Sequence, residues 1–353
     1  MAGMKQIEFF SEENILSQLS SMGDPLEKVS KAVDFEMFRP TLNNAFQKES
    51  SGIGGRPAWD CVLMFKILLL QQWYSIADDR TEYMINDRLS FQRFLGLSKV
   101  PDAKTIWLFR ENLTKSALYE KLFRKFAWRM EKQGVITRKG SIIDVSFVDA
   151  PRQRNTREEN TVIKAGAGAD LWKDDLHKRR QKDIDARWAK KNNETHYGYK
   201  DHVKVDRDSK MIVTYSVTDA SVHDSREVIR LLDKKDRKVN LDSAYVGDAL
   251  HQAIRQKCPK VKLIVNEKGY RNKPLTEEQK VNNREKSRVR ARVEHVFGHM
   301  AKSFGGISVR AIGIVRAQCQ IAFKNLAYNL QRYECLLRLG LVSRTVMLRV
   351  KSA

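Results

Sequence analysis

The stretch Ser141-Ile-Ile-Asp-Val-Ser-Phe-Val-Asp149 decides the fold, because it is an apolar run with a carboxylate in its middle. Its branched and aromatic residues favour a strand, and Gly140 before it and Pro151 after it are typical of turns. An ionised Asp144 inside a strand is costly unless it is paired, hydrogen-bonded or bound to a cation. The sequence therefore predicts a strand that holds an acidic residue for a functional reason.

Two further acidic residues downstream stand in comparable settings. Asp242 lies near the end of the short apolar segment at residues 239–245, and Glu294 lies in residues 288–297, which contain no breaker and are predicted to be helical. Two strand-borne aspartates and a helix-borne glutamate can converge on a pair of divalent cations, as phosphoryl transfer on nucleic acid requires. The candidate catalytic and metal-binding residues are thus Asp144, Asp242 and Glu294.

Six separated segments carry a resemblance to a known family. They are QQWY at 71–74, FQRF at 91–94 leading to Pro101-Asp102, IDVSFVDAP at 143–151, HYGYK at 196–200, DSAY at 242–245 and RVRARVEH at 288–295. In this order they resemble the bacterial insertion-sequence transposases of the IS5 group, within the IS4-like superfamily of DDE transposases. The resemblance implies a ribonuclease-H-like fold in which the three candidate carboxylates hold two Mg²⁺ ions, with Mn²⁺ able to substitute.

The signature helix of that family reads Tyr, two residues, Arg, three residues, Glu, six residues, Lys. Arg290 and Glu294 fit this spacing, whereas Ser287 replaces the tyrosine and Lys302 comes one residue late. Arg290 lies one helical turn before Glu294, where it can orient the carboxylate or meet a phosphate. A surface helix with an ordinary Arg–Glu pair is the alternative. The DNA-contact candidates of this segment are Arg288, Arg290, Arg292 and Lys302.

Composition narrows the class of partner. A net charge of +22 over 353 residues exceeds what solubility requires and indicates a polyanionic partner, the alternative being a basic protein with a solvated surface. A hydrophobic content of 42% supplies cores for two or three domains and excludes a disordered chain. The four cysteines form no CxxC pair, the N-terminus lacks a signal-like run, and the longest apolar stretch is too short to span a bilayer. We therefore expect a cytoplasmic, nucleoid-associated protein without a membrane partner.

Residues 1–134 are predicted to form an all-helical domain for DNA binding or dimerisation. A helix at 58–74 follows a turn-rich loop, Asp78 or Asp79 can cap a second helix, and Asp102 is a plausible N-cap of a third. Short helices punctuated in this way suggest a helix-turn-helix-like module. Its groove-facing candidates are Lys104, Thr105, Trp107 and Arg110. The alternative is that Ile106, Trp107 and Phe109 only fill a helical core.

From residue 135 the pattern changes to alternating strands and helices, and residues 135–335 are predicted to be the catalytic domain, followed by a tail at 336–353. Beyond the first strand we expect a hairpin formed by residues 197–206 and 211–217, followed by a helix at 224–232. The Asp242 strand at 239–242, one more strand at 263–265 and a long apolar helix at 311–339 come next. Residues 196–200 are expected beside the Asp144 strand, with Lys200 as a candidate DNA contact. The predicted fold class is α/β, a ribonuclease-H-like domain with a mixed sheet and flanking helices, preceded by an all-helical DNA-binding domain.

A charged insertion at about 153–193 interrupts the predicted catalytic domain. Its candidate contacts to DNA phosphates are Lys178, Arg179 and Arg180, and Trp172 and Trp188 can stack on bases. A solvated face or linker is the alternative. An alternative interpretation is a zinc or histidine-metal nuclease that uses His196, His202 and His223. The spacings of these histidines match no closed zinc pattern.

The predicted function, on the resemblance and the carboxylates together, is DNA transposition. The protein would bind double-stranded DNA, both the terminal inverted repeats of its element and the target, as a homodimer. It would catalyse metal-dependent cleavage, after which the freed 3′-hydroxyl attacks target DNA. The alternative is a DNA-binding regulator derived from a transposase that has lost its activity.

Overall fold

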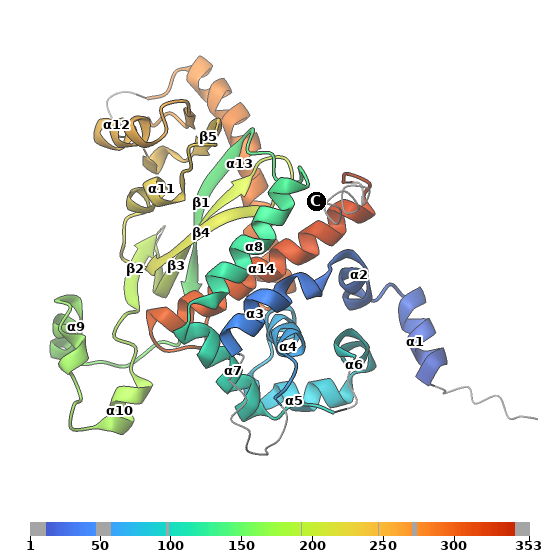
Figure 1. The fold of residues 1–353 in the computed structure, drawn as a ribbon. Helices are drawn as coiled ribbons and strands as arrows, with labels where there is room; N and C mark the ends of the chain where they lie inside the picture. Colours follow the sequence, from blue (N-terminus) through green and yellow to red (C-terminus); the bar gives the residue numbers. More distant parts are fainter. Residues whose placement is uncertain are drawn as a thin grey trace, which may run out of the picture.

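A computed structural model describes residues 12–46, 58–96, 99–191, 193–245, 247–269 and 274–342. A group of helices formed by the N-terminal part of the chain lies against one side of a sheet, and further helices cover the sheet (Figure 1). This is the predicted α/β class, with a helical N-terminal region before a ribonuclease-H-like mixed sheet. None of the described helices is long and apolar enough to cross a membrane.

The N-terminal region contains eight α-helices within its described residues. They are α1 (Glu12–Ser21), α2 (Pro25–Ala32), α3 (Arg39–Phe46), α4 (Cys61–Tyr74), α5 (Asp78–Asp87), α6 (Leu89–Leu95), α7 (Ala103–Lys115) and α8 (Leu118–Lys132), with a 3₁₀ turn at Phe35–Phe38. The Asp102 carboxylate accepts the Thr105 N–H at the start of α7, which confirms the predicted cap. The predicted cap of α5 is wrong: Ala77 is its N-cap residue and makes no side-chain cap, while Asp78 lies inside the helix and pairs with Arg110.

The sheet has six strands, and the predicted strand at 141–149 is its centre. The strands are β1 (Ser141–Asp149), β2 (Arg187–Lys191), β3 (Glu194–Asp206), β4 (Ile212–Asp219), β5 (Lys238–Leu241) and β6 (Lys262–Val265). β3 runs antiparallel to β1, to β4 and, through its first residues, to β2, whereas β5 runs parallel to β1 and β6 parallel to β5. The hairpin, the short strand at 263–265 and the strand ahead of Asp242 are therefore confirmed.

Six further α-helices follow β1 in the described chain. They are α9 (Arg157–Lys164), α10 (Leu176–Gln181), α11 (Ser225–Leu231), α12 (Asp248–Lys257), α13 (Glu277–Ser303) and α14 (Ile314–Arg338), with 3₁₀ turns at Gly168–Asp170 and Ser243–Tyr245. The charged insertion folds as α9, α10 and β2, and its two helices stand apart from the sheet (Figure 1). Glu294 lies on α13, as the absence of breakers predicted.

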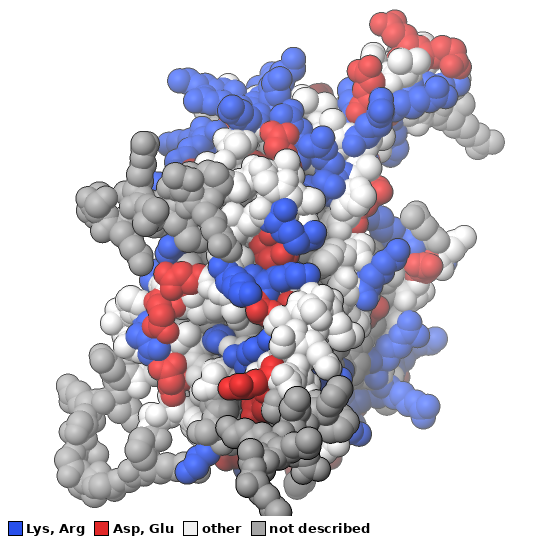
Figure 2. Space-filling model, turned by 90° about the vertical axis from the view of Figure 1, so that its right-hand side faces the viewer, with Lys and Arg blue, Asp and Glu red and all other residues white. Residues whose placement is uncertain are grey.

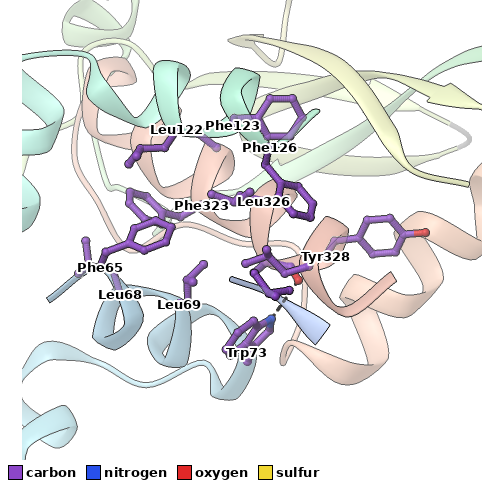
Figure 3. Close-up of a cluster of buried hydrophobic side chains, with 14 of the residues drawn as sticks. Phe65, Leu68, Leu69, Trp73, Leu122, Phe123, Phe126, Phe323, Leu326 and Tyr328 are labelled. Atoms are coloured by element: carbon purple, nitrogen blue, oxygen red, sulfur yellow. Dashed lines mark hydrogen bonds between the residues drawn. The ribbon is translucent and has the colours of Figure 1, made fainter. Parts of the chain in front are cut away.

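One hydrophobic core joins the N-terminal helices, one face of the sheet and α14. The Trp73 indole N–H donates to the Ala327 carbonyl at 3.0 Å, and Phe65, Phe123 and Phe323 belong to the same buried cluster (Figure 3). Fully burying such side chains contributes roughly 1.5–3 kcal/mol each. Most apolar residues of the helix predicted at 311–339 are buried in this core, but Val315 is 52% exposed. The N-terminal helices and the sheet therefore share one interior rather than two.

Candidate active site

The register of β1 and β5 brings Asp144 and Asp242 together. Ile142 on β1 is paired with Asn240 on the parallel strand β5, and each aspartate follows its paired residue by two positions. Neighbouring strands lie about 4.8 Å apart, and residues two positions apart project from the same face. The two carboxylates therefore stand side by side at the carboxyl end of β5.

Helix α13 covers this face of the sheet and places a guanidinium between the aspartates. Val293 and Val296 are buried in the same core as Ile142, which fixes the helix against β1. Arg290 Nη1 donates to Asp242 Oδ1 at 2.9 Å, and its Nη2 lies 3.9 Å from Asp144 Oδ2. One cationic group thus reaches both carboxylates. Carboxylate oxygens are the ligands that Mg²⁺ prefers, so this acidic pair fits a divalent cation.

The Asp144 carboxyl has an unusual environment for an acid. Burial raises the pKa of Asp144, and the backbone N–H of Val145 and the Arg290 guanidinium only partly oppose that effect. The same N–H, 2.9 Å from Asp144 Oδ1, also fixes the orientation of the carboxylate. The Ser243 N–H does the same for Asp242 at 2.7 Å. Both carboxylates are therefore held in place, and burial destabilises the Asp144 anion despite the nearby Arg290.

Glu294 lies one turn beyond Arg290 on α13, and its side chain is exposed. Helical spacing places it on the same side of the helix as Arg290, which touches both aspartates. Within the described ranges, no group of three or more His, Cys, Asp or Glu side chains is close enough to hold a metal ion. The structure thus joins the two aspartates through Arg290 and leaves Glu294 exposed on α13, outside any such group.

Tyr245 lies within electrostatic range of the acidic pair and of a further acid, Asp224. Tyr245 is buried, and its pKa is raised by burial and then by the negative charges of Asp224, Asp144 and Asp242. The DSAY segment contains Tyr245, but nothing in the sequence indicates that its hydroxyl group is influenced by both aspartates. Asp224 directly follows His223 and accepts from Lys200 Nζ at 2.7 Å.

The histidines do not form a metal centre with one another in the described chain. His202 is buried, bonds Thr218 Oγ1 through Nε2, and has a pKa lowered to about 4 by burial. His223 Nδ1 bonds Ser225 Oγ, and the His196 ring stacks on Phe147 at 4.0 Å. These rings make hydrogen bonds and stacking contacts instead.

The predicted DNA-contact residues of α13 and β3 fall into two groups. Arg288 and Lys302 are exposed, whereas Arg290 lies between the aspartates and Arg292 donates to the Arg207 carbonyl. Lys200 is only 8% exposed, and its Nζ donates to Asp224 and to the Val222 carbonyl. In this structure the Lys200 ammonium is used within the protein, because a buried cation needs a partner.

The predicted contacts on α7 and in the insertion also differ in exposure. Lys104 is exposed, Thr105 bonds the capping Asp102, and Arg110 forms a bidentate pair with Asp78 at 2.6 and 2.5 Å. Arg110 is therefore not a free groove-facing side chain. Ile106 and Phe109 are buried as the core interpretation requires, but Trp107 is 46% exposed.

In the insertion, Lys178 pairs with Glu159 at 2.8 Å, whereas Arg179 and Arg180 are exposed. Trp172 Nε1 donates to Glu159, and Trp188 packs on Tyr197. Lys and Arg side chains also gather over the upper part of the face shown in Figure 2. The surface thus retains basic groups without local acidic partners.

Two family profiles match the chain. The profile described as "Transposase DDE domain" matches residues 137–330, and "Transposase domain (DUF772)" matches residues 13–112. A cryo-EM structure of the piggyBac transposase synaptic complex with hairpin DNA is similar over 95% of this chain and 83% of that chain, with 12% identity and a TM-score of 0.40. Asp144, Asp242 and Glu294 all fall within the first profile match.

Proposed function

Since the chain belongs to the transposase DDE domain family, we propose that it is an insertion-sequence transposase of the IS5 group that cleaves and joins DNA at Asp144, Asp242 and Glu294. The observation that carries the proposal is that the register of the parallel strands β1 and β5 places the two aspartates side by side, with one guanidinium reaching both. Glu294 on the covering helix completes the set because it lies one turn from that guanidinium.

Two Mg²⁺ ions, or Mn²⁺ in their place, would supply Lewis-acid activation of the attacking oxygen and stabilisation of the leaving oxygen when bound to these carboxylates. The chain's own residues prepare the site. The N–H groups of Val145 and Ser243 orient the two aspartates. Arg290 offsets part of the negative charge of the aspartates, and Glu294 remains exposed, where incoming DNA can approach.

The partner in this proposal is double-stranded DNA, comprising the ends of the element and its target. The net charge of +22 supplies the attraction to phosphates, and exposed Arg288 and Lys302 lie on the same helix as Glu294. A homodimer fits this function because an element has two ends, each requiring an active site.

The test uses Asp144→Asn, Asp242→Asn and Glu294→Gln with DNA that carries the ends of the element. Each change keeps the shape of the side chain and removes its charge, so we expect DNA binding and the folded state to persist. Cleavage and strand transfer in Mg²⁺ should fall by on the order of 10³-fold or more, and double substitutions should cost little beyond the single ones. Glu285→Gln, at another exposed glutamate of α13, is the matched control and should cleave normally.

If any one of the three variants cleaves DNA near the wild-type rate, the residue substituted in that variant does not belong to the active site. A wild-type protein that binds the ends but never cleaves them in Mg²⁺ or Mn²⁺ would instead be a regulator.

A further inference from the structure

A basic cleft of about 810 Å³ opens where the N-terminal helices, the insertion and α14 meet. Its walls come from the end of α4, from α5, α7 and α10, from residues 304–312 and from α14. These elements belong to three separate stretches of the chain, and Figure 1 places them toward the end of the sheet opposite α12. The cleft therefore lies outside the acidic site.

The cleft carries an excess of positive charge. The lining side chains that carry charge are Arg110, Arg179, Arg180, Arg310, Arg316 and Lys324 against Asp78 and Glu111. Both acids are already neutralised, since Arg110 pairs with Asp78 and Arg316 pairs with Glu111 at 2.8 Å. Within the described ranges, no carboxylate lies within 4.0 Å of the other four cations.

Two of those four cations are fixed in place without losing their charge. Arg310 donates to the Ser75 carbonyl and Lys324 to the Gly306 carbonyl, both neutral acceptors. Burial lowers the pKa of Lys324 to about 8, so it is still mainly protonated at pH 7. The cleft thus presents anchored cations to an anionic ligand.

Trp107 adds an aromatic surface to this basic lining. Trp107 is 46% exposed and its neighbour Leu108 is 53% exposed, whereas Ile106 and Phe109 are buried, so Trp107 lies on the side of α7 that faces away from the core. An aromatic ring among unpaired arginines is the combination that binds unpaired nucleotides, with bases stacked on the ring and phosphates on the cations. The volume falls in the range of about 300–1,000 Å³ that is typical of small-ligand sites, so the cleft has room for individual nucleotides.

The cleft is connected to the acidic site through β1. Asp149 at the end of β1 bridges to Ser308 in the cleft wall, and its carbonyl accepts the Val309 N–H at 2.9 Å. Asp144 lies five residues earlier on the same strand, which corresponds to about 17 Å. A DNA strand of a few nucleotides can span that distance.

We propose that this cleft binds an unpaired segment of the DNA substrate, with a base stacked on Trp107 and phosphates held by Arg179, Arg180 and Arg310. The inference rests on the proposed function, because it assumes that DNA lies at the acidic site. It assigns a second DNA site in which the insertion and the N-terminal helices act together.

The test measures fluorescence anisotropy of a labelled thymidine 10-mer, an abasic 10-mer and a duplex, without divalent metal. Trp107→Ala should weaken binding of the thymidine 10-mer by about tenfold and leave the abasic 10-mer and the duplex unchanged. Trp107→Phe should retain most of the affinity. Arg179→Ala combined with Arg180→Ala should weaken both 10-mers. Trp128→Ala, at an exposed tryptophan on α8 outside the cleft, is the control and should bind normally.

Unchanged binding of the thymidine 10-mer by Trp107→Ala would overturn the proposal, as would an equal loss with the abasic 10-mer. Tighter, Trp107-dependent binding of a uridine 10-mer would overturn it in favour of RNA. If the alanine variant does not fold, Trp107→Gln takes its place. The two proposals fail separately. Normal binding by Trp107→Ala with carboxylate-dependent cleavage overturns only the cleft, and Trp107-dependent binding without cleavage overturns only the transposase activity.

Discussion

Arg290→Gln tests whether the guanidinium substitutes for a bound cation between the two aspartates. The side chains of Arg290, Asp144 and Asp242 are 18%, 20% and 38% exposed. Breaking a fully buried ion pair costs about 3–5 kcal/mol, and breaking an exposed pair costs about 0–1 kcal/mol. Because Asp242 is more than one-third exposed and solvent screens its charge, we expect a loss of about 1–3 kcal/mol.

The assay is thermal unfolding of the metal-free protein at pH 7.5 with a chelator. Arg290→Gln should melt a few degrees below the wild type. Arg288→Gln, at an exposed arginine of the same helix, is the matched control and should melt normally. Adding Asp144→Asn to Arg290→Gln should restore part of the loss, because it removes one of two like charges.

Divalent cations supply the second half of this test. Mg²⁺ or Mn²⁺ should raise the melting temperature of Arg290→Gln more than that of the wild type, since the ion no longer competes with the guanidinium. Equal melting temperatures of Arg290→Gln and the wild type in chelator, together with equal shifts on adding metal, would refute the reasoning.

Three further predictions concern the pH dependence of stability, a glycine in the sheet and the salt dependence of DNA binding. Burial raises the pKa of Asp201 to about 7, so the folded state keeps the carboxyl proton to a higher pH than the unfolded state. The free energy of unfolding should therefore fall as the pH rises from about 4 to about 7. Asp201→Asn should remove this pH dependence and raise the melting temperature at pH 8. A Cβ on Gly198, which has φ +145°, would lie 2.3 Å from the Val148 carbonyl oxygen, so Gly198→Ala should lower the melting temperature by several degrees, whereas Gly298→Ala in helix α13, with open space around it, should raise it slightly. Equilibrium binding to duplex DNA should weaken by about 10³-fold or more between 50 and 200 mM salt, and an unchanged affinity would contradict phosphate-dominated binding.

The elements of the catalytic half were predictable because their signals are local. The strand at 141–149 follows from its branched residues and flanking turns, and the breaker-free run around Glu294 predicts α13. The Asp102 cap of α7 depends on a bond three residues away. The failed cap of α5 shows the limit, since Asp78 is a good capping residue whose carboxylate instead pairs with Arg110, 32 residues later.

The partners of the charged side chains were not predictable from local patterns. Lys200, Arg110 and Arg292 are basic residues that sequence alone favours as DNA contacts, yet each meets a distant acceptor inside the protein. Exposed Arg179 and Arg180 look the same in the sequence. The difference lies in what the fold places beside each group, and a buried cation must find a partner there.

The sequence by itself determined the class of fold, the order of the elements and the three carboxylates proposed for the chemistry, since each follows from local periodicity or from the resemblance of short segments. The tertiary structure alone decided that Asp144 and Asp242 lie on either side of Arg290, and that Trp107 lines the same cleft as Arg179 and Arg180, about 70 residues away in the sequence. The physical reason is that strand register and helix packing are set by burial of apolar faces distributed along the whole chain. Contacts such as Trp73 with Ala327, 254 residues apart, therefore leave no local signal in the sequence.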